Sequence, residues 1–119
     1  MKLIIAGTAE LLVDAELIDQ LIKHYRLTVT EVVCGVGGRV DEAGEDYSDL
    51  WMEKEPKIFR ANWSHEGAKA GTNRNIKMAE YSDALLLIWD GVSKDALNIK
   101  KEMDKLVKPV YEVILRVYE

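Results

Sequence analysis

The chain has only one cysteine and two histidines among its 119 residues, and this shortage excludes two classes of protein. Cys34 has no partner for a disulfide within the chain, so a small domain held together by disulfides is excluded. One cysteine with two histidines does not supply the usual ligand set of a structural zinc ion. We therefore expect no metal site, no cofactor of that kind, and a reducing compartment.

Long hydrophobic stretches and an excess of positive charge are also lacking. The longest apolar run covers residues 84–89, far short of the roughly 18 consecutive residues of a membrane span. The N-terminus lacks the longer apolar region and cleavage site of a signal peptide. Sixteen basic against 21 acidic residues give a net charge of −5, which repels bulk nucleic acid. We therefore expect a cytoplasmic protein without a membrane or bulk nucleic-acid partner.

Proline is sparse as well, at two residues, proline and glycine together number only ten, and there is no repeat or linker-like tract. Hydrophobic residues make up 48% and charged residues 31% of the chain, as in soluble globular domains. At roughly 100 to 200 residues per domain, the length predicts one domain over residues 1–119.

Short apolar runs alternate with longer amphipathic stretches. Helical periodicity covers 18–25, 40–51, 71–82 and 94–106, with Asp14 and Ser93 as predicted N-caps. Such alternation, with right-handed crossovers, predicts an α/β fold: a Rossmann-like three-layer α/β/α domain whose five-stranded parallel sheet has the order 3-2-1-4-5. The predicted strands are 2–6, 30–34, 56–60, 83–89 and 109–115.

In a sheet of this kind, a ligand lies beyond the carboxyl ends of the strands, where the strand order reverses. The segments that follow the first four predicted strands are 7–10, 35–39, 61–65 and 90–93. Glycines occur in three of these segments, which lets backbone N–H groups approach a ligand closely. We expect the functional residues in these segments.

Residues 34–41 lead from a strand into the clearest helix. Gly35, Gly37 and Gly38 predict a tight turn whose amides suit a phosphate or another polar group. The turn is neither the G-x-G-x-x-G fingerprint, because Val40 occupies the third glycine position, nor a P-loop. The alternative is a flexible strand-to-helix turn in which Asp41 and the next residue complement the helix dipole.

Residues 62–75 carry an unusual density of polar side chains for a connection. Arg74 falls in the first turn of the predicted helix, where a cation is slightly unfavourable, so a bound anion is one reason for its presence. The alternative is an ion pair between Arg74 and a carboxylate of a neighbouring loop. Trp63 either stacks on a base or partner chain, or covers the helix against the sheet. His65 is interpreted as a solvated loop histidine.

Residues 89–93 follow the most buried predicted strand. Asp90 is placed to accept hydrogen bonds from ribose hydroxyls or to act on a proton. The alternative is that Asp90 and Gly91 only form the turn before Ser93. Cys34 ends another apolar strand, where a buried small residue is favoured over a nucleophile.

Together these motifs resemble the SLOG superfamily of Rossmann-like nucleotide-binding domains, and most closely its YspA-like branch, which is common in bacterial and phage genomes. The similar segments are Ile-Ile-Ala-Gly-Thr, Cys-Gly-Val-Gly-Gly-Arg-Val-Asp, Lys-Ala-Gly-Thr-Asn-Arg-Asn and Trp-Asp-Gly-x-Ser, within residues 2–115. The chain departs from the family at Gly7-Thr8-Ala9, where an arginine is lost. Arg39 either replaces that arginine electrostatically or fills the pocket.

The resemblance implies a set of ligand contacts in these loops. It carries over most directly to the Ala-Gly-x-x-Arg-Asn and Trp-Asp-Gly segments. The candidate ligand-binding residues are Gly7, Thr8, Gly35, Gly37, Gly38, Arg39, Asp41, Gly71, Arg74, Asn75, Asp90, Gly91 and Ser93.

The resemblance also implies a function. Its hydrolase members have Pro-Gly-Gly-x-Gly-Thr followed by a catalytic Glu, and this chain has neither the proline nor the Gly-Thr. We therefore expect a non-catalytic domain that binds a nucleotide-derived small molecule as a sensor or by sequestration. The resemblance also implies a homodimer and a bacterial or phage origin. The alternatives are a phosphoribohydrolase-like enzyme using Asp41, Glu42 or Asp90, and a degenerate scaffold without ligand.

Overall fold

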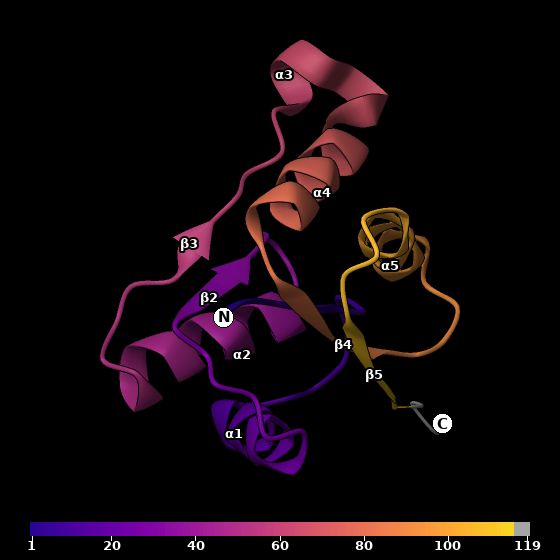
Figure 1. Ribbon diagram of the computed structural model, residues 1–119. Coiled ribbons are helices and arrows are strands. Elements are labelled where there is room, and N and C mark those ends of the chain that lie inside the picture. Colours follow the sequence, from indigo (N-terminus) through magenta and orange to yellow (C-terminus); the bar gives the residue numbers. More distant parts are fainter. Residues whose placement is uncertain (116–119) are drawn as a thin grey trace.

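Five parallel strands form one sheet in the order β3-β2-β1-β4-β5 (Figure 1). The computed structural model describes residues 1–115. It confirms the predicted α/β class, the parallel pairing and the strand order. The strands are β1 (Lys2–Gly7), β2 (Glu31–Cys34), β3 (Lys57–Ile58), β4 (Ala84–Trp89) and β5 (Val110–Ile114).

Four helices make the crossovers and cover both faces of the sheet, which confirms the three-layer arrangement (Figure 1). α1 (Ala15–His24) and α2 (Arg39–Asp46) pack on one face, and α4 (Ala70–Tyr81) and α5 (Lys94–Lys105) on the other. Shorter elements are a π-helical turn η1 (Tyr47–Trp51), α3 (Trp63–Glu66) and a 3-10 turn η2 (Gly67–Lys69). No helix within residues 1–115 is long and apolar enough to cross a membrane.

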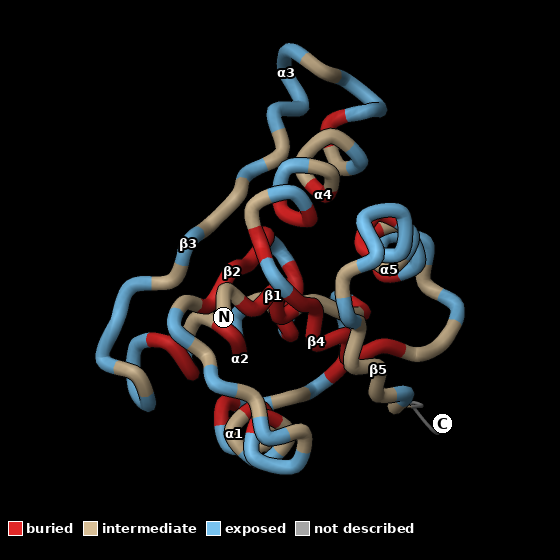
Figure 2. Tube along the Cα trace, viewed as in Figure 1, coloured by how far each residue is buried: buried red, intermediate tan, exposed pale blue. Residues whose placement is uncertain are grey.

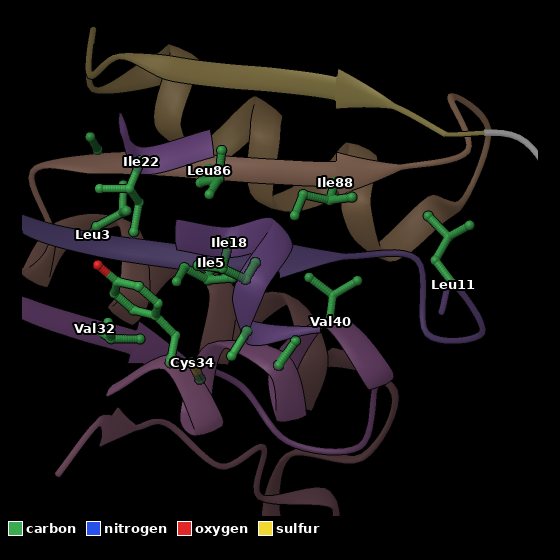
Figure 3. Packing of buried hydrophobic residues seen from close by; sticks show 14 residues of the cluster. Leu3, Ile5, Leu11, Ile18, Ile22, Val32, Cys34, Val40, Leu86 and Ile88 are labelled. Carbon is green, nitrogen blue, oxygen red and sulfur yellow. The ribbon is translucent and has the colours of Figure 1, made fainter. Parts of the chain in front are cut away.

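Alternating side chains of the central strands fill the two cores. Leu3 and Ile5 of β1 lie in the cluster under α1 and α2 (Figure 3), whereas Ile4 points into the cluster under α4 and α5. All of β4 is buried, as Figure 2 shows in red. Burying one such large apolar side chain contributes about 1.5–3 kcal/mol, so the sheet holds both helix layers in place.

The two predicted helix caps have different outcomes. Asp14 caps α1, because its Oδ1 accepts a hydrogen bond of 2.9 Å from the Leu17 N–H. Ser93 occupies the predicted N-cap position of α5, but its hydroxyl makes no capping hydrogen bond. The Asp90 Oδ1 accepts hydrogen bonds from the N–H groups of Val92 and Ser93, which precede the helix.

Two other predicted elements also differ from the structure. β3 is shorter than the predicted strand 56–60, since only Lys57 and Ile58 pair with β2, opposite Val33 and Cys34. The apolar stripe predicted over 40–51 is buried as far as Tyr47, but Leu50 and Trp51 are exposed. The chain changes to π-helical geometry at Tyr47, which turns the last two apolar side chains away from the core.

Candidate functional site

A cleft of about 590 Å³ lies at the carboxyl edge of the sheet, beside β1, the segments after β2 and β4, and the middle of α4. Its volume falls in the range of roughly 300–1,000 Å³ that is typical of small-molecule sites. This is the place predicted from the parallel topology. The lining residues are Ala6, Gly7, Thr8, Ala9, Glu10, Gly35, Val36, Gly37, Gly38, Asp41, Arg74, Asn75, Met78, Ser93, Lys94 and Asp95.

Gly7 and Thr8 join the first loop of the cleft to the segment after β4. A Cβ atom at position 7 would lie 1.7 Å from the carbonyl oxygen of Ile88, so only glycine permits this approach of β1 to β4. The buried Thr8 Oγ1 accepts a hydrogen bond of 3.0 Å from the Asp90 N–H and lies 3.1 Å from the Ser93 Oγ. These contacts fix the β1 and β4 ends of the cleft relative to each other.

The glycine-rich turn after β2 forms the opposite wall and leads directly into α2. Gly37 has φ +109°, a conformation that favours glycine. The Arg39 N–H donates to the Ala9 carbonyl at 2.9 Å, which ties this turn to the loop after β1. The Gly38 N–H donates to the Oδ2 of Asp41 at 3.3 Å. The turn is therefore held from both sides while its glycines line the cleft.

Arg74 reaches from α4 across to this turn. A Cβ atom at position 35 would lie 2.8 Å from the Arg74 Nη1, so the guanidinium rests on the backbone of Gly35. The Arg74 Nε donates to the Asn75 Oδ1 at 3.2 Å. Among residues 1–115, no carboxylate lies within 4.0 Å of the guanidinium, so the predicted alternative of a loop ion pair does not occur there.

The start of α4 changes the reason for an arginine at this position. The helix begins at Ala70, preceded by η2 and α3, so Arg74 lies in the second turn and not in the predicted first turn. The dipole effect falls off within the first turn, so it does not disfavour a cation at Arg74. The case for an anion therefore rests on a guanidinium in the cleft that has no carboxylate within 4.0 Å among residues 1–115, and whose charge acts on Asp41 only from a longer distance.

Asp41 supplies a carboxyl group beside this cation. Burial raises the pKa of Asp41 above its ordinary value, whereas the positive charge of Arg74 and the N–H groups of Gly38 and Gly35 act in the opposite direction. Burial is the larger effect. Among the three candidate acids, Asp41 is the one that lines the cleft.

Asp90 lies outside the cleft lining, and its carboxylate serves its own turn. Hydrogen bonds from the N–H groups of Val92 and Ser93 lower its pKa, with the Thr8 hydroxyl contributing in the same direction. Gly91 has φ +87°, which completes the turn. This geometry matches the alternative in which Asp90 and Gly91 form the connection to α5.

The structure brings nine of the thirteen candidate residues together in the cleft. Arg39 is exposed at the start of α2, and Gly71 packs under Trp63, since a Cβ atom there would lie 3.5 Å from the Trp63 Cη2. The nine that line the cleft are Gly7, Thr8, Gly35, Gly37, Gly38, Asp41, Arg74, Asn75 and Ser93, and the four outside it are Arg39, Gly71, Asp90 and Gly91.

Sequence reasoning missed several charged and apolar lining residues. Lys94 and Asp95 lie in the first turn of α5, and Glu10 lies in the loop after β1. Extending the search from the strand ends into the first turn of each helix would have found Lys94 and Asp95. No sequence pattern marks Glu10. The buried Met78 of α4 is indistinguishable in sequence from any other core residue.

Cys34 is the one cysteine of the chain, and its thiol is buried. Cys34 is fully buried, and burial followed by the carboxylates of Asp41 and Glu45 raises the pKa of its thiol. A thiol in such surroundings is a poor nucleophile.

Within residues 1–115, no cluster of three or more His, Cys, Asp or Glu side chains is arranged to hold a metal ion.

Comparison with known proteins finds no match among protein-family models, curated proteins or solved structures.

Proposed function

We propose that this chain binds a nucleotide-derived small molecule in the cleft, without turnover, as a sensor or sequestering domain of the SLOG type. One observation carries the proposal: the Arg74 guanidinium lies on Gly35 inside the cleft, with no ion-pair partner among residues 1–115. A positive group held in this way is suited to an anionic ligand.

The anionic group of the ligand would bind between Arg74 and the glycine-rich turn. Arginine presents five N–H donors, and Asn75 occupies only the Nε donor, so both Nη atoms remain for an anion. The turn at Gly35 to Gly38 lies next to the N-terminus of α2, which favours negative charge. The N–H groups of Gly35 and Gly38 already bind the Asp41 carboxyl group, so Arg74 is the principal contact for the anion. This combination suits a phosphate group.

The rest of the ligand would extend toward the other wall of the cleft. Hydroxyl groups of Thr8 and Ser93 and the carboxyl group of Asp41 are partners for sugar hydroxyls. Val36 and Met78 supply apolar surface for a base. Together with Arg74, these groups can contact the phosphate, the sugar and the base of a nucleotide.

Binding without turnover is favoured by the state of the candidate acids. Asp90 is occupied by two backbone N–H groups and lies outside the cleft lining, as does Glu42. Asp41 alone remains as an acid or base for the hydrolase alternative. Glycosidic cleavage normally employs two carboxyl groups that flank the bond, and Asp41 has no such counterpart among the three acids considered. An enzyme would need Glu10 or Asp95, which also line the cleft, as the second carboxyl group.

A ligand screen tests the proposal directly. Thermal unfolding is followed with nucleoside monophosphates, cyclic nucleotides and ADP-ribose derivatives, and each hit is measured by calorimetry. A ligand at 100 times its dissociation constant should stabilise the fold by about 2.7 kcal/mol. If no member of the panel raises the melting temperature at millimolar concentration, the scaffold without ligand replaces this proposal.

A further inference from the structure

Asn98 of α5 does not line the cleft, yet a chain of hydrogen bonds connects it to Arg74. The Asn98 Oδ1 accepts a hydrogen bond of 2.8 Å from the Asn75 Nδ2. The Asn75 Oδ1 in turn accepts one of 3.2 Å from the Arg74 Nε. Asn75 is only 5% exposed, so water has little access to its amide. We call these three residues the Asn98 relay.

The chemistry of the side chains fixes the direction of the relay. Arginine has donors only, so Asn75 must turn its oxygen toward the Nε of Arg74. The Asn75 amide nitrogen then points to α5, where it needs an acceptor. Asn98 supplies that acceptor only with its oxygen facing Asn75. Reversing either amide would place two donors opposite each other.

We propose that Asn98 is a positioning residue for the anion site. It holds the amide of Asn75 in the orientation that binds the Arg74 Nε, and this keeps the guanidinium over Gly35 with both Nη atoms free for the ligand. The inference rests on the proposed function for its ligand arm. The proposal also changes the role of Asn75. Its main effect on the ligand is to orient Arg74, and its own contact with the ligand is secondary.

The relay can be tested first in the protein without ligand. Exchange of the Arg74 Hε with water is measured by ¹⁵N NMR, and the signal is assigned by its loss in Arg74→Ala. We expect this exchange to be severalfold faster in Asn98→Ala than in the parent. Asn98→Asp keeps an oxygen opposite Asn75 and should restore slow exchange. Unchanged exchange in Asn98→Ala would overturn the proposal.

A matched control separates the relay from a general loosening of the helices. Asn73→Ala removes another amide of α4, whose Nδ2 donates to the Oε2 of Glu66 at 2.7 Å, and it should leave the Arg74 Hε unchanged. Alanine has a higher helix propensity than asparagine, so Asn98→Ala should remain folded. If it does not, Asn98→Ser answers the same question with a hydroxyl too short to reach Asn75.

The ligand arm uses AMP as the probe. We expect Asn98→Ala to bind AMP about fivefold more weakly than the parent, which corresponds to about 1 kcal/mol. In the Arg74→Ala background the same substitution should have no further effect, because the relay acts only through that guanidinium. An equal loss in both backgrounds would contradict the relay. Failure of the parent to bind AMP would count against the choice of ligand alone, since the exchange experiment decides the relay independently.

Discussion

A Cβ atom on residue 35 would lie 2.8 Å from the Nη1 atom of Arg74, so the guanidinium occupies the space that a side chain at Gly35 would need. Gly35→Ala should therefore displace the guanidinium, which is the flexible end of its side chain, while the fold is retained. We expect AMP to bind severalfold more weakly, measured by calorimetry. In the Arg74→Ala background the added methyl meets no such group, so the effect should vanish. A persistent effect would contradict this explanation.

Arg74→Ala itself tests whether the arginine binds a ligand or supports the fold. The side chain has no carboxylate within 4.0 Å among residues 1–115, and its removal takes away one hydrogen bond to Asn75 and a favourable charge near Asp41, so the melting temperature of the free protein should fall only slightly. Charge-assisted hydrogen bonds contribute about 1.5–3 kcal/mol, so AMP affinity should fall at least tenfold. The exposed Lys77 on the same helix, changed to alanine, is the charge-matched control.

The opposite pattern would assign Arg74 a structural role. If Arg74→Ala melts several degrees lower and binds AMP as well as the parent, the side chain supports the fold and the anion site must lie elsewhere along the glycine-rich turn.

Two glycines should respond to alanine in opposite directions. Gly7→Ala would place a Cβ atom 1.7 Å from the Ile88 carbonyl oxygen in the centre of the sheet, so we expect no stably folded protein. Gly71→Ala meets only the Trp63 ring at 3.5 Å and lies within α4. It should stabilise the fold by about 0.5–1 kcal/mol through helix propensity. Chemical denaturation measures both, and a destabilised Gly71→Ala would contradict the assigned packing.

The raised pKa of Asp41 predicts how its charge affects stability. Because burial favours the neutral form in the folded state, the ionised carboxylate opposes folding above that pKa. Stability is therefore lost as the pH rises from the ordinary value of 3.8 through the folded pKa. Asp41→Asn should melt at a higher temperature than the parent at pH 7, and the difference should vanish as the pH falls toward 4.

The control for this experiment is the neighbouring exposed carboxylate, changed in Glu42→Gln. This variant should show a much smaller difference in melting temperature at neutral pH. A lower melting temperature for Asp41→Asn at pH 7 would mean that the attraction to Arg74 outweighs the effect of burial.

The hydrolase alternative makes a separate prediction. Incubation with nucleoside monophosphates should release no free base above background, because the chain lacks the Pro-Gly-Gly-x-Gly-Thr segment of the hydrolases. Chromatography of the products measures this. Base release that disappears in Asp41→Asn would reverse the order of the two functions, and Asp90→Asn should leave any such release unchanged.

The sheet could be predicted because several independent features of the sequence indicate it. The apolar run 84–89 is long enough to mark a strand that is buried on both faces, and right-handed crossovers leave few possible strand orders. The exposed edge was less predictable. Lys57 and Ile58 form the whole of β3, because its length depends on pairing with β2 and not on its own apolar pattern.

The site could be predicted to the level of its loops but not of its individual contacts. Parallel topology places the turns that follow the strands at one edge of the sheet, so Gly7 and Gly35 could be expected to line the same cleft. Which partner a polar side chain chooses is decided in three dimensions. Asp90 turns to its own loop, Ser93 turns to Thr8, and Asn98 becomes linked to Arg74 only because α4 and α5 pack together.

The contact between Thr8 and Ser93 cannot form until the ribosome has added both residues. The two residues are 85 positions apart, and at roughly 5–20 residues per second the ribosome adds Ser93 about 4–17 s after Thr8. Until then, the loop after β1 lacks the segment that closes it, and Asn98 has not yet been added. A nascent chain that has completed only β1, β2 and β3 therefore has its glycine turns but no closed cleft. Ligand would stabilise the protein only after the last third of the chain has emerged.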